Sequence, residues 1–217
     1  MFSSVNIKNL SKHLGQKLVL PAVSLVFAFG LSMAPVQAAN QSDNPFMTTG
    51  GLTSQPIGHY DFCKRLPNEC NQTFTQTAPI KLDQSVWAKI VLVNADVNTR
   101  IQPVTDMELY GQEEYWAYPV NAGDCEDYVL LKRRELAEAG LPLSSLLITV
   151  LRKPDGEGHA VLTVRTDRGD FILDNLTDAV KNWQETDYTY LKRQAANHTG
   201  RWVSIETPSN LVVGAVK

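Results

Sequence analysis

The sequence lacks several features that would assign it to a common class of protein. It has no internal repeat, no low-complexity tract and, beyond residue 36, no apolar run long enough to cross a bilayer. It has no excess of basic residues either: the formal net charge is -3, and it moves to -6 when residues 1–38, which hold three lysines and no acid, are removed. Nucleic acids and anionic membranes favour basic surfaces, so we expect neither as the main partner. At 217 residues the chain suffices for one domain with a core but not for two large ones.

The first 38 residues have the pattern of a secretory signal peptide. Basic residues precede an apolar run at 18–36, and Val36-Gln37-Ala38-Ala39 then offers small residues to a signal peptidase. An uncleaved membrane anchor is the alternative, but the run contains two prolines and is short for a membrane span. We therefore expect a periplasmic or secreted protein with no stable membrane span after cleavage.

Polar segments flank the expected domain. Residues 39–55 are rich in Gly, Ser and Thr, which predicts a flexible arm. The domain is expected to run from 56 to 207, and residues 208–217 to form a tail.

Two amphipathic helices are predicted to precede a group of strands. Apolar residues recur at three- and four-residue steps from Leu82 to Ile101, and again within 124–140, where Asp124 suits the N-cap and Gly140 the end. Strands are predicted at 146–151, 160–165, 171–173 and 201–206, with a turn at 167–170 and a partly helical stretch at 177–196. Helices followed by an antiparallel sheet indicate the α+β class.

Three cysteines suggest one disulfide and one remaining thiol. Cys63 and Cys70 lie close together across a Pro-containing loop, which predicts that they pair in an oxidising compartment; the alternative is two free, buried thiols. Either way Cys125 has no obvious mate, and an odd cysteine in an exported protein is a candidate reactive thiol.

The surroundings of Cys125 suggest a nucleophile. In Gly123-Asp124-Cys125-Glu126-Asp127-Tyr128 the cysteine falls in the first turn of a predicted helix, where unpaired N–H groups favour the thiolate and can hold an oxyanion. The three neighbouring carboxylates have the opposite effect, because they raise the pKa of a thiol and disfavour the thiolate. A bound cation would resolve this conflict.

A nucleophilic cysteine needs a base, and three histidines follow residue 38: His59, His159 and His198. His159 is favoured because it precedes a strand and follows glycines that allow close approach of another segment. His198 lies in a polar stretch, and His59 is interpreted as a capping or surface residue.

The base in turn needs an acid to orient it, and Asp174 ends the following strand. A simple hairpin closed at residues 168–169 would set Asp174 across from Thr163, too far from His159 without a bulge or curvature. On spacing alone Asp178 is a rival.

Three segments in this order resemble the bacterial transglutaminase-like cysteine peptidases: GDCEDY at 123–128, GHAVLTV at 158–164 and LDN at 173–175. The resemblance implies a papain-like core with helices packed on an antiparallel sheet, and Cys125, His159 and Asp174 as a catalytic triad, which demotes Asp178. The best-known relatives are periplasmic, calcium-dependent proteases that clip surface adhesins and release biofilms. It further implies a calcium site that draws on Asp124, Glu126 and Asp127, although Asp124 can also serve as a helix cap.

The function expected from these features is peptide-bond hydrolysis through an acyl-enzyme, possible substrates being surface proteins such as an adhesin. Two alternatives stay open. An amine instead of water as acceptor would make the protein a transglutaminase or amidase with the same triad, and an inactive triad would leave a non-catalytic calcium-binding interaction module.

Overall fold

The structure is a computed structural model that describes residues 44–206. The expected signal peptide, at 1–38, and the expected tail, at 208–217, lie outside these residues. No helix within 44–206 combines the length and the apolar character needed to cross a membrane.

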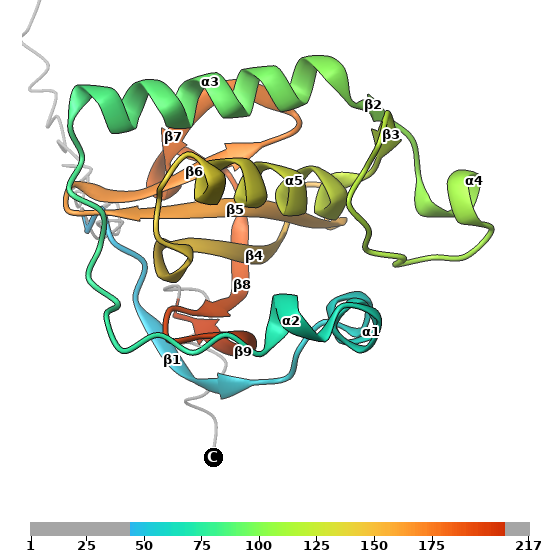
Figure 1. The fold of residues 1–217 in the computed structure, drawn as a ribbon, viewed down its shortest axis with the longest axis horizontal. Coiled ribbons are helices and arrows are strands. Elements are labelled where there is room, and N and C mark those ends of the chain that lie inside the picture. Colours follow the sequence, from blue (N-terminus) through green and yellow to red (C-terminus); the bar gives the residue numbers. More distant parts are fainter. Residues whose placement is uncertain (1–43, 207–217) are drawn as a thin grey trace, which may run out of the picture. The chain divides into compact units, whose positions relative to one another are not determined.

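The described residues form an α+β fold, as the sequence predicts (Figure 1). The helices are α1 (Ile57–Arg65), α2 (Pro67–Cys70), α3 (Gln84–Arg100), α4 (Asp106–Tyr110) and α5 (Cys125–Glu138), with 3₁₀ turns η1 (Leu143–Ser145) and η2 (Trp183–Glu185). The strands are β1 (Thr49–Thr53), β2 (Gln102–Pro103), β3 (Ala122–Gly123), β4 (Leu146–Arg152), β5 (Gly158–Thr166), β6 (Gly169–Asp174), β7 (Thr177–Asn182), β8 (Thr189–Ala195) and β9 (His198–Ile205). One seven-stranded antiparallel sheet has the order β1-β9-β8-β4-β5-β6-β7, and β2 pairs with β3 in parallel.

The two long helices occupy the predicted segments and cover one face of the sheet. The carboxylate of Asp83 caps α3 by accepting from the backbone N–H of Val86 at 2.8 Å. α3 packs against β7, and α5 packs against β4 and β5.

Side chains of the central strands alternate between two cores. Leu162 and Leu173 belong to the larger core, which also contains residues of α3 and α5, whereas Val161 and Ile172 belong to a smaller core with Tyr190. Because successive residues of a strand point to opposite faces, both faces of β5 and β6 are buried. The strands that carry His159 and Asp174 are therefore held from both sides.

The prediction of a flexible arm at 39–55 is wrong for the part that forms β1. Thr49–Thr53 pairs with β9, and a Cβ on Gly50 would lie 2.5 Å from the Ser204 hydroxyl oxygen. The small, polar residues that suggested a flexible arm instead allow strand β1 to approach β9 closely. The domain thus begins before Pro56.

The partly helical stretch expected at 177–196 is also wrong, because it forms β7, η2 and β8. Strand β7 is at the edge of the sheet and leaves Asp178, Ala179 and Lys181 exposed, so its polar composition hides the strand pattern. Backbone pairing with neighbouring strands, which the sequence does not display, determines its structure.

Cys63 and Cys70 form the predicted disulfide, with 5.5 Å between their Cα atoms. It joins α1 to α2, and α1 packs on the segment that leads to Cys125: the Arg65 guanidinium donates to the carbonyl oxygen of Trp116 at 2.7 Å. A Cβ on Gly58 would lie 2.4 Å from the Trp116 ring. The disulfide-bonded pair of helices thereby supports that segment.

Candidate active site

Cys125 is the first residue of α5 and the only free cysteine of the chain. Gly123 is needed just before it, since a Cβ there would lie 2.6 Å from the Asp127 carboxylate. Asp124 occupies the N-cap position, as predicted, but its side chain does not cap α5 and accepts instead from the backbone N–H of Asp106 at 3.3 Å. Because the Asp124 side chain does not cap α5, the positive end of the helix acts on Cys125.

The thiol of Cys125 lies between the acids of α5 and strand β5. It donates a hydrogen bond to Glu126 Oε2 at 3.1 Å, and the backbone of Ala160, the residue after His159, acts to lower the pKa of the thiol. Although Cys125 keeps some solvent contact, burial of its surroundings and the Glu126 carboxylate raise the thiol pKa well above its usual value. In this arrangement the sulfur is protonated and rests against the strand that carries His159.

His159 and Asp174 are in direct contact. Nε2 of His159 lies 2.8 Å from Asp174 Oδ1, and the residues are 6 % and 2 % exposed. Within 44–206 no hydrogen bond joins His159 to Cys125, and none involves Nδ1 of His159.

The register of the hairpin explains how His159 and Asp174 meet. The turn has two residues, as expected, but it is shifted by one position, since Thr166 pairs with Gly169, so Ile172 rather than Asp174 is opposite Thr163. Continuing this register places Asp174 opposite Val161, on the same face as His159 and only two residues away. Such diagonal neighbours are within reach of long side chains without a bulge.

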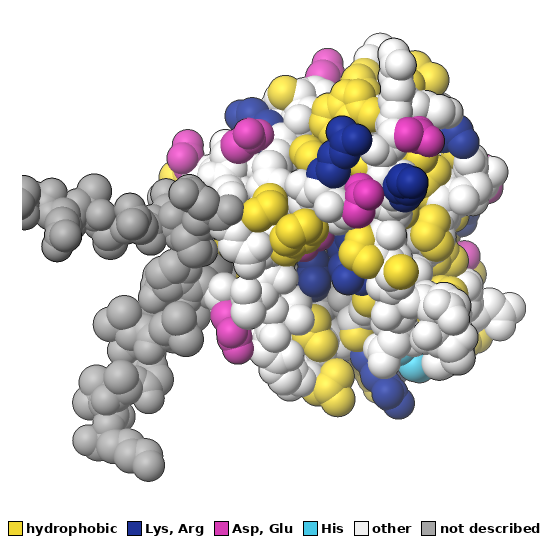
Figure 2. Space-filling view, turned by 90° about the vertical axis from the view of Figure 1, so that its left-hand side faces the viewer, with side chains coloured by type: hydrophobic (Ala, Val, Ile, Leu, Met, Phe, Trp, Pro, Cys, Tyr) yellow, Lys and Arg dark blue, Asp and Glu magenta, His cyan; other side chains and the backbone are white. Residues whose placement is uncertain are grey.

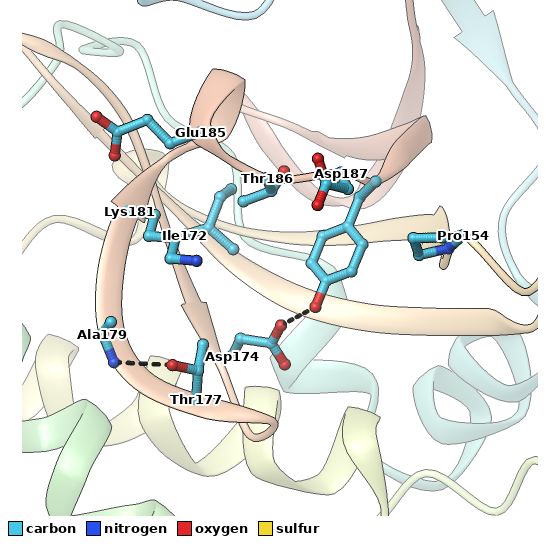
Figure 3. Close-up of a pocket in the computed structure, with 10 residues that line it drawn as sticks. Pro154, Ile172, Asp174, Thr177, Ala179, Lys181, Glu185, Thr186 and Asp187 are labelled. Atoms are coloured by element: carbon cyan, nitrogen blue, oxygen red, sulfur yellow. Dashed lines mark hydrogen bonds between the residues drawn. The ribbon is translucent and has the colours of Figure 1, made fainter. Parts of the chain in front are cut away.

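The Asp174 carboxylate is held by more than the histidine. Its Oδ2 accepts from the Tyr188 hydroxyl at 2.6 Å (Figure 3), and its Oδ1 also accepts from the backbone N–H of Leu176 at 3.0 Å. Burial alone would raise the pKa of Asp174, but the bonds from His159, Tyr188 and Leu176 together lower it below its usual value. The Tyr188 ring also packs edge-on against His159, with centroids 5.9 Å apart. A cavity of about 150 Å³ opens beside Asp174 and Tyr188.

The rival residues occupy other places. Asp178 accepts from the side chain of Asn98 at 2.9 Å. His59, expected at the surface, is buried among Phe62, Trp116 and Trp202, and burial lowers its pKa to about 3. Nδ1 of His198 accepts from the backbone N–H of Gly200 at 3.0 Å.

A group of acids next to Cys125 has the character of a cation site. Asp106, Asp124 and Glu126 each offer a carboxylate oxygen, all within 4.8 Å of one another. One oxygen of Asp106 and one of Asp124 are buried and have no hydrogen-bond partner among the described residues. Burial and the neighbouring Asp124 raise the pKa of Asp106, and they raise that of Glu126 to about 9. Buried carboxylates with free lone pairs are what a hard cation such as calcium binds.

Asp127, which the sequence also suggested as a ligand, lies outside this group. Its Oδ1 accepts from the backbone N–H of Ala117 at 2.7 Å, its Oδ2 has no partner among residues 44–206, and burial raises its pKa to about 8. Asp106, which the sequence analysis missed, lies in the group instead. Its only local signal is its place at the start of α4, after the capping residue Thr105.

Comparison with known proteins identifies the family. A sequence profile of the bacterial transglutaminase-like cysteine proteinases matches residues 49–210. The chain belongs to this family. The protein is therefore a cysteine peptidase with an α+β fold, and its protein-cleaving class implies a protein substrate.

Among solved structures, the proteinase is similar to LapG of Legionella pneumophila. LapG is 26 % identical over 58 % of this chain and 72 % of that chain, with a TM-score of 0.47. Calcium-bound LapG is 24 % identical over 57 % and 73 %, with a TM-score of 0.48, and EGTA-treated LapG is 25 % identical over 58 % and 74 %, with a TM-score of 0.47. The comparison with curated proteins found no match.

Proposed function

We propose that this proteinase is exported and hydrolyses peptide bonds with Cys125 as nucleophile, His159 as base and Asp174 as the residue that orients the base. The observation that carries the proposal is the buried contact of 2.8 Å between His159 Nε2 and Asp174 Oδ1, on the strand against which the free thiol rests. A base fixed by an acid beside a cysteine at a helix N-terminus is the arrangement that thiol acyl transfer requires.

The hydrogen bonds assign a tautomer to the base. A carboxylate only accepts, so Nε2 of His159 carries the proton that it donates to Asp174, and Nδ1 has the lone pair. Nδ1 then takes the thiol proton of Cys125, the sulfur attacks the substrate carbonyl, and the same nitrogen returns the proton to the leaving amine. Water resolves the thioester. Catalytic pairs often lie apart in the free enzyme and tighten with substrate bound, which fits the absence of a Cys125–His159 bond within 44–206.

Oxyanion stabilisation is assigned to the start of α5. The first N–H groups of a helix have no intrahelical partner and lie at its positive end. We assign the oxyanion contact to the backbone N–H of Cys125 or to a nearby side chain.

Tyr188 is proposed as a positioning residue. It touches neither the thiol nor the scissile bond, but its hydroxyl fixes the second oxygen of Asp174 and its ring restrains His159. Both contacts orient the base.

The acids beside Cys125 are proposed to hold calcium. Asp106, Asp124 and Glu126 fit this ion because two of their buried oxygens lack partners within the described chain and their charges repel one another. A bound cation supplies positive charge that lets these carboxylates ionise together. Such an ion would engage Glu126, the residue that accepts from the Cys125 thiol.

Export and substrate are part of the same proposal. The signal-like N-terminus and the Cys63–Cys70 disulfide support a periplasmic or secreted protein. The proposed substrate is therefore a protein of the periplasm or cell surface, and surface adhesins, with biofilm release as the outcome, are the first to test.

The decisive experiment compares cells that produce the wild type with cells that produce Cys125→Ala. We expect surface proteomics to show a cleaved protein with the wild type only, while circular dichroism and thermal unfolding show the variant folded. Asp174→Asn should reduce cleavage strongly, whereas Asp178→Asn, a matched change of the neighbouring acid, should not. Cleavage by Cys125→Ala would refute the proposal. Incorporation of a labelled amine into a Gln peptide would instead establish amine transfer.

A further inference from the structure

A second pocket lies on the other side of the domain, near the turn after β5 and the loop between β8 and β9. It has a volume of about 300 Å³, and the two basic side chains that line it are Arg165 and Arg193. Figure 2 views this side of the domain, where Lys and Arg side chains are visible at the bottom of a hollow. Arg165 is six residues from His159 on β5, about 20 Å along an extended strand. The pocket is therefore separate from the candidate active site.

Arg193 is buried with part of its hydrogen-bonding capacity unused. The residue is 6 % exposed; its Nη1 donates to Asp170 Oδ2 at 2.8 Å, and its Nε is buried with no partner among residues 44–206. A guanidinium has five N–H donors, and a buried donor without an acceptor costs free energy. Because Arg193 lines the pocket, an anion that enters it meets a guanidinium that still has an unpaired donor.

The charges of the pocket do not balance. Asp170 is the one carboxylate bonded to Arg193, and its Oδ2 is also occupied by the backbone N–H of Met47 at 3.0 Å. Arg165 donates to the carbonyl oxygen of Thr77 at 3.1 Å and forms no ion pair within the described residues. Repulsion from Arg165 and burial both act to lower the pKa of Arg193. The two guanidinium groups therefore have one bonded carboxylate between them, and it pairs with Arg193 alone.

We propose that this pocket binds a small oxyanion, a carboxylate or a phosphate monoester, between Arg165 and Arg193. Both anions present the paired oxygens that a guanidinium binds in two parallel hydrogen bonds. The volume is at the lower end of the range of small-molecule sites, which suits a compact anion and not a polymer. The site is independent of the cysteine chemistry and would persist in an inactive enzyme.

The test is a titration of the full chain, carrying Cys125→Ala to prevent self-cleavage, followed by NMR at the arginine Nε–H signals. Inorganic phosphate and acetate are added separately to calcium-free protein at constant ionic strength kept with sodium chloride. We expect the Arg193 signal to shift and saturate with at least one of them. A response to phosphate alone assigns phosphate esters, and a response to acetate alone assigns carboxylates.

Two variants separate a built site from a general ionic effect. Arg165→Met should raise the half-saturation concentration roughly tenfold, which corresponds to the loss of about 1.4 kcal/mol. Arg168→Met, which removes an exposed arginine from the turn on the same side, should leave it unchanged. Arg165→Lys serves as the test if the methionine variant does not fold, and it should weaken binding because lysine lacks the paired donors. Equal responses in all variants, or none to either anion, would overturn the proposal.

Discussion

Replacing Tyr188 by phenylalanine removes one hydroxyl and keeps the ring that packs on His159. The lost bond, 2.6 Å long, ends on Asp174, which is 2 % exposed. A hydrogen bond to a charged group contributes about 1.5–3 kcal/mol net, and since Tyr188 is only half-buried we expect a loss near the lower limit, about 1.5 kcal/mol at pH 7. Urea unfolding measures this directly as a lower midpoint with an unchanged slope.

The pH dependence identifies Asp174 as the source of that loss. Because the pKa of Asp174 is lowered in the folded protein, its contribution is complete above the unfolded value of about 3.9 and disappears as pH falls through the folded value. The difference in stability between the wild type and Tyr188→Phe should therefore be full at pH 7 and shrink below about pH 4. The same variant should also lower the rate of substrate cleavage, because Asp174 is then held less firmly.

Tyr190→Phe is the matched control. The Tyr190 hydroxyl bonds to Thr186 at 2.9 Å, so its loss should cost about 0.5–1.5 kcal/mol with little change between pH 7 and pH 3. If Tyr188→Phe lost the same stability at both pH values, the bond to an ionised Asp174 would be refuted.

Three further predictions concern other parts of the domain. Calcium added to metal-free protein should raise the free energy of unfolding, measured in urea, by about 2.7 kcal/mol at a hundredfold excess over Kd, and Asp106→Asn should reduce the gain; an equal gain in the variant would exclude Asp106 as a ligand. Lys132 is 1 % exposed, and burial, opposed by Asp174 and Asp178, lowers its pKa to about 7. Lys132→Met should therefore stabilise the fold by on the order of 1–4 kcal/mol below pH 7 and less as pH approaches 10, so a gain that grew with pH would contradict the reasoning. Reducing the Cys63–Cys70 disulfide, which spans a sequence separation of 7, should cost about 2.5 kcal/mol in thermal unfolding, whereas the Cys63→Ser, Cys70→Ser double variant should no longer respond to reductant.

Elements determined by local patterns were predictable from the sequence. The periodicity from Leu82 to Ile101 and the Asp83 cap predict α3, and the apolar runs on either side of Arg168-Gly169 predict β5 and β6. Strands β1 and β7 were not predictable, because strands at an edge of the sheet can be polar and lack a strand pattern of their own. The partner of β1, strand β9, is also distant in sequence.

The candidate site likewise has residues that were predictable from local sequence and residues that were not. The first helical position of Cys125 follows from its own neighbours, and the meeting of His159 with Asp174 required only the correct position of the turn. Asp106 and Tyr188 come from other elements, and no spacing in the sequence relates them to Asp124 or to Asp174. Only the folded chain brings them together.

The tight turn between β5 and β6 has a consequence for engineering this domain. Asp167 and Arg168 form its tip, and the Asp167 carboxylate anchors it by accepting from the backbone N–H of Leu82 at 2.9 Å. An insertion at the tip that made β6 slip by one residue against β5 would turn every side chain beyond it to the reverse side. Asp174 would then face the helices instead of the imidazole. A foreign loop grafted onto this hairpin must therefore keep Thr166 opposite Gly169, even where its composition is free to vary.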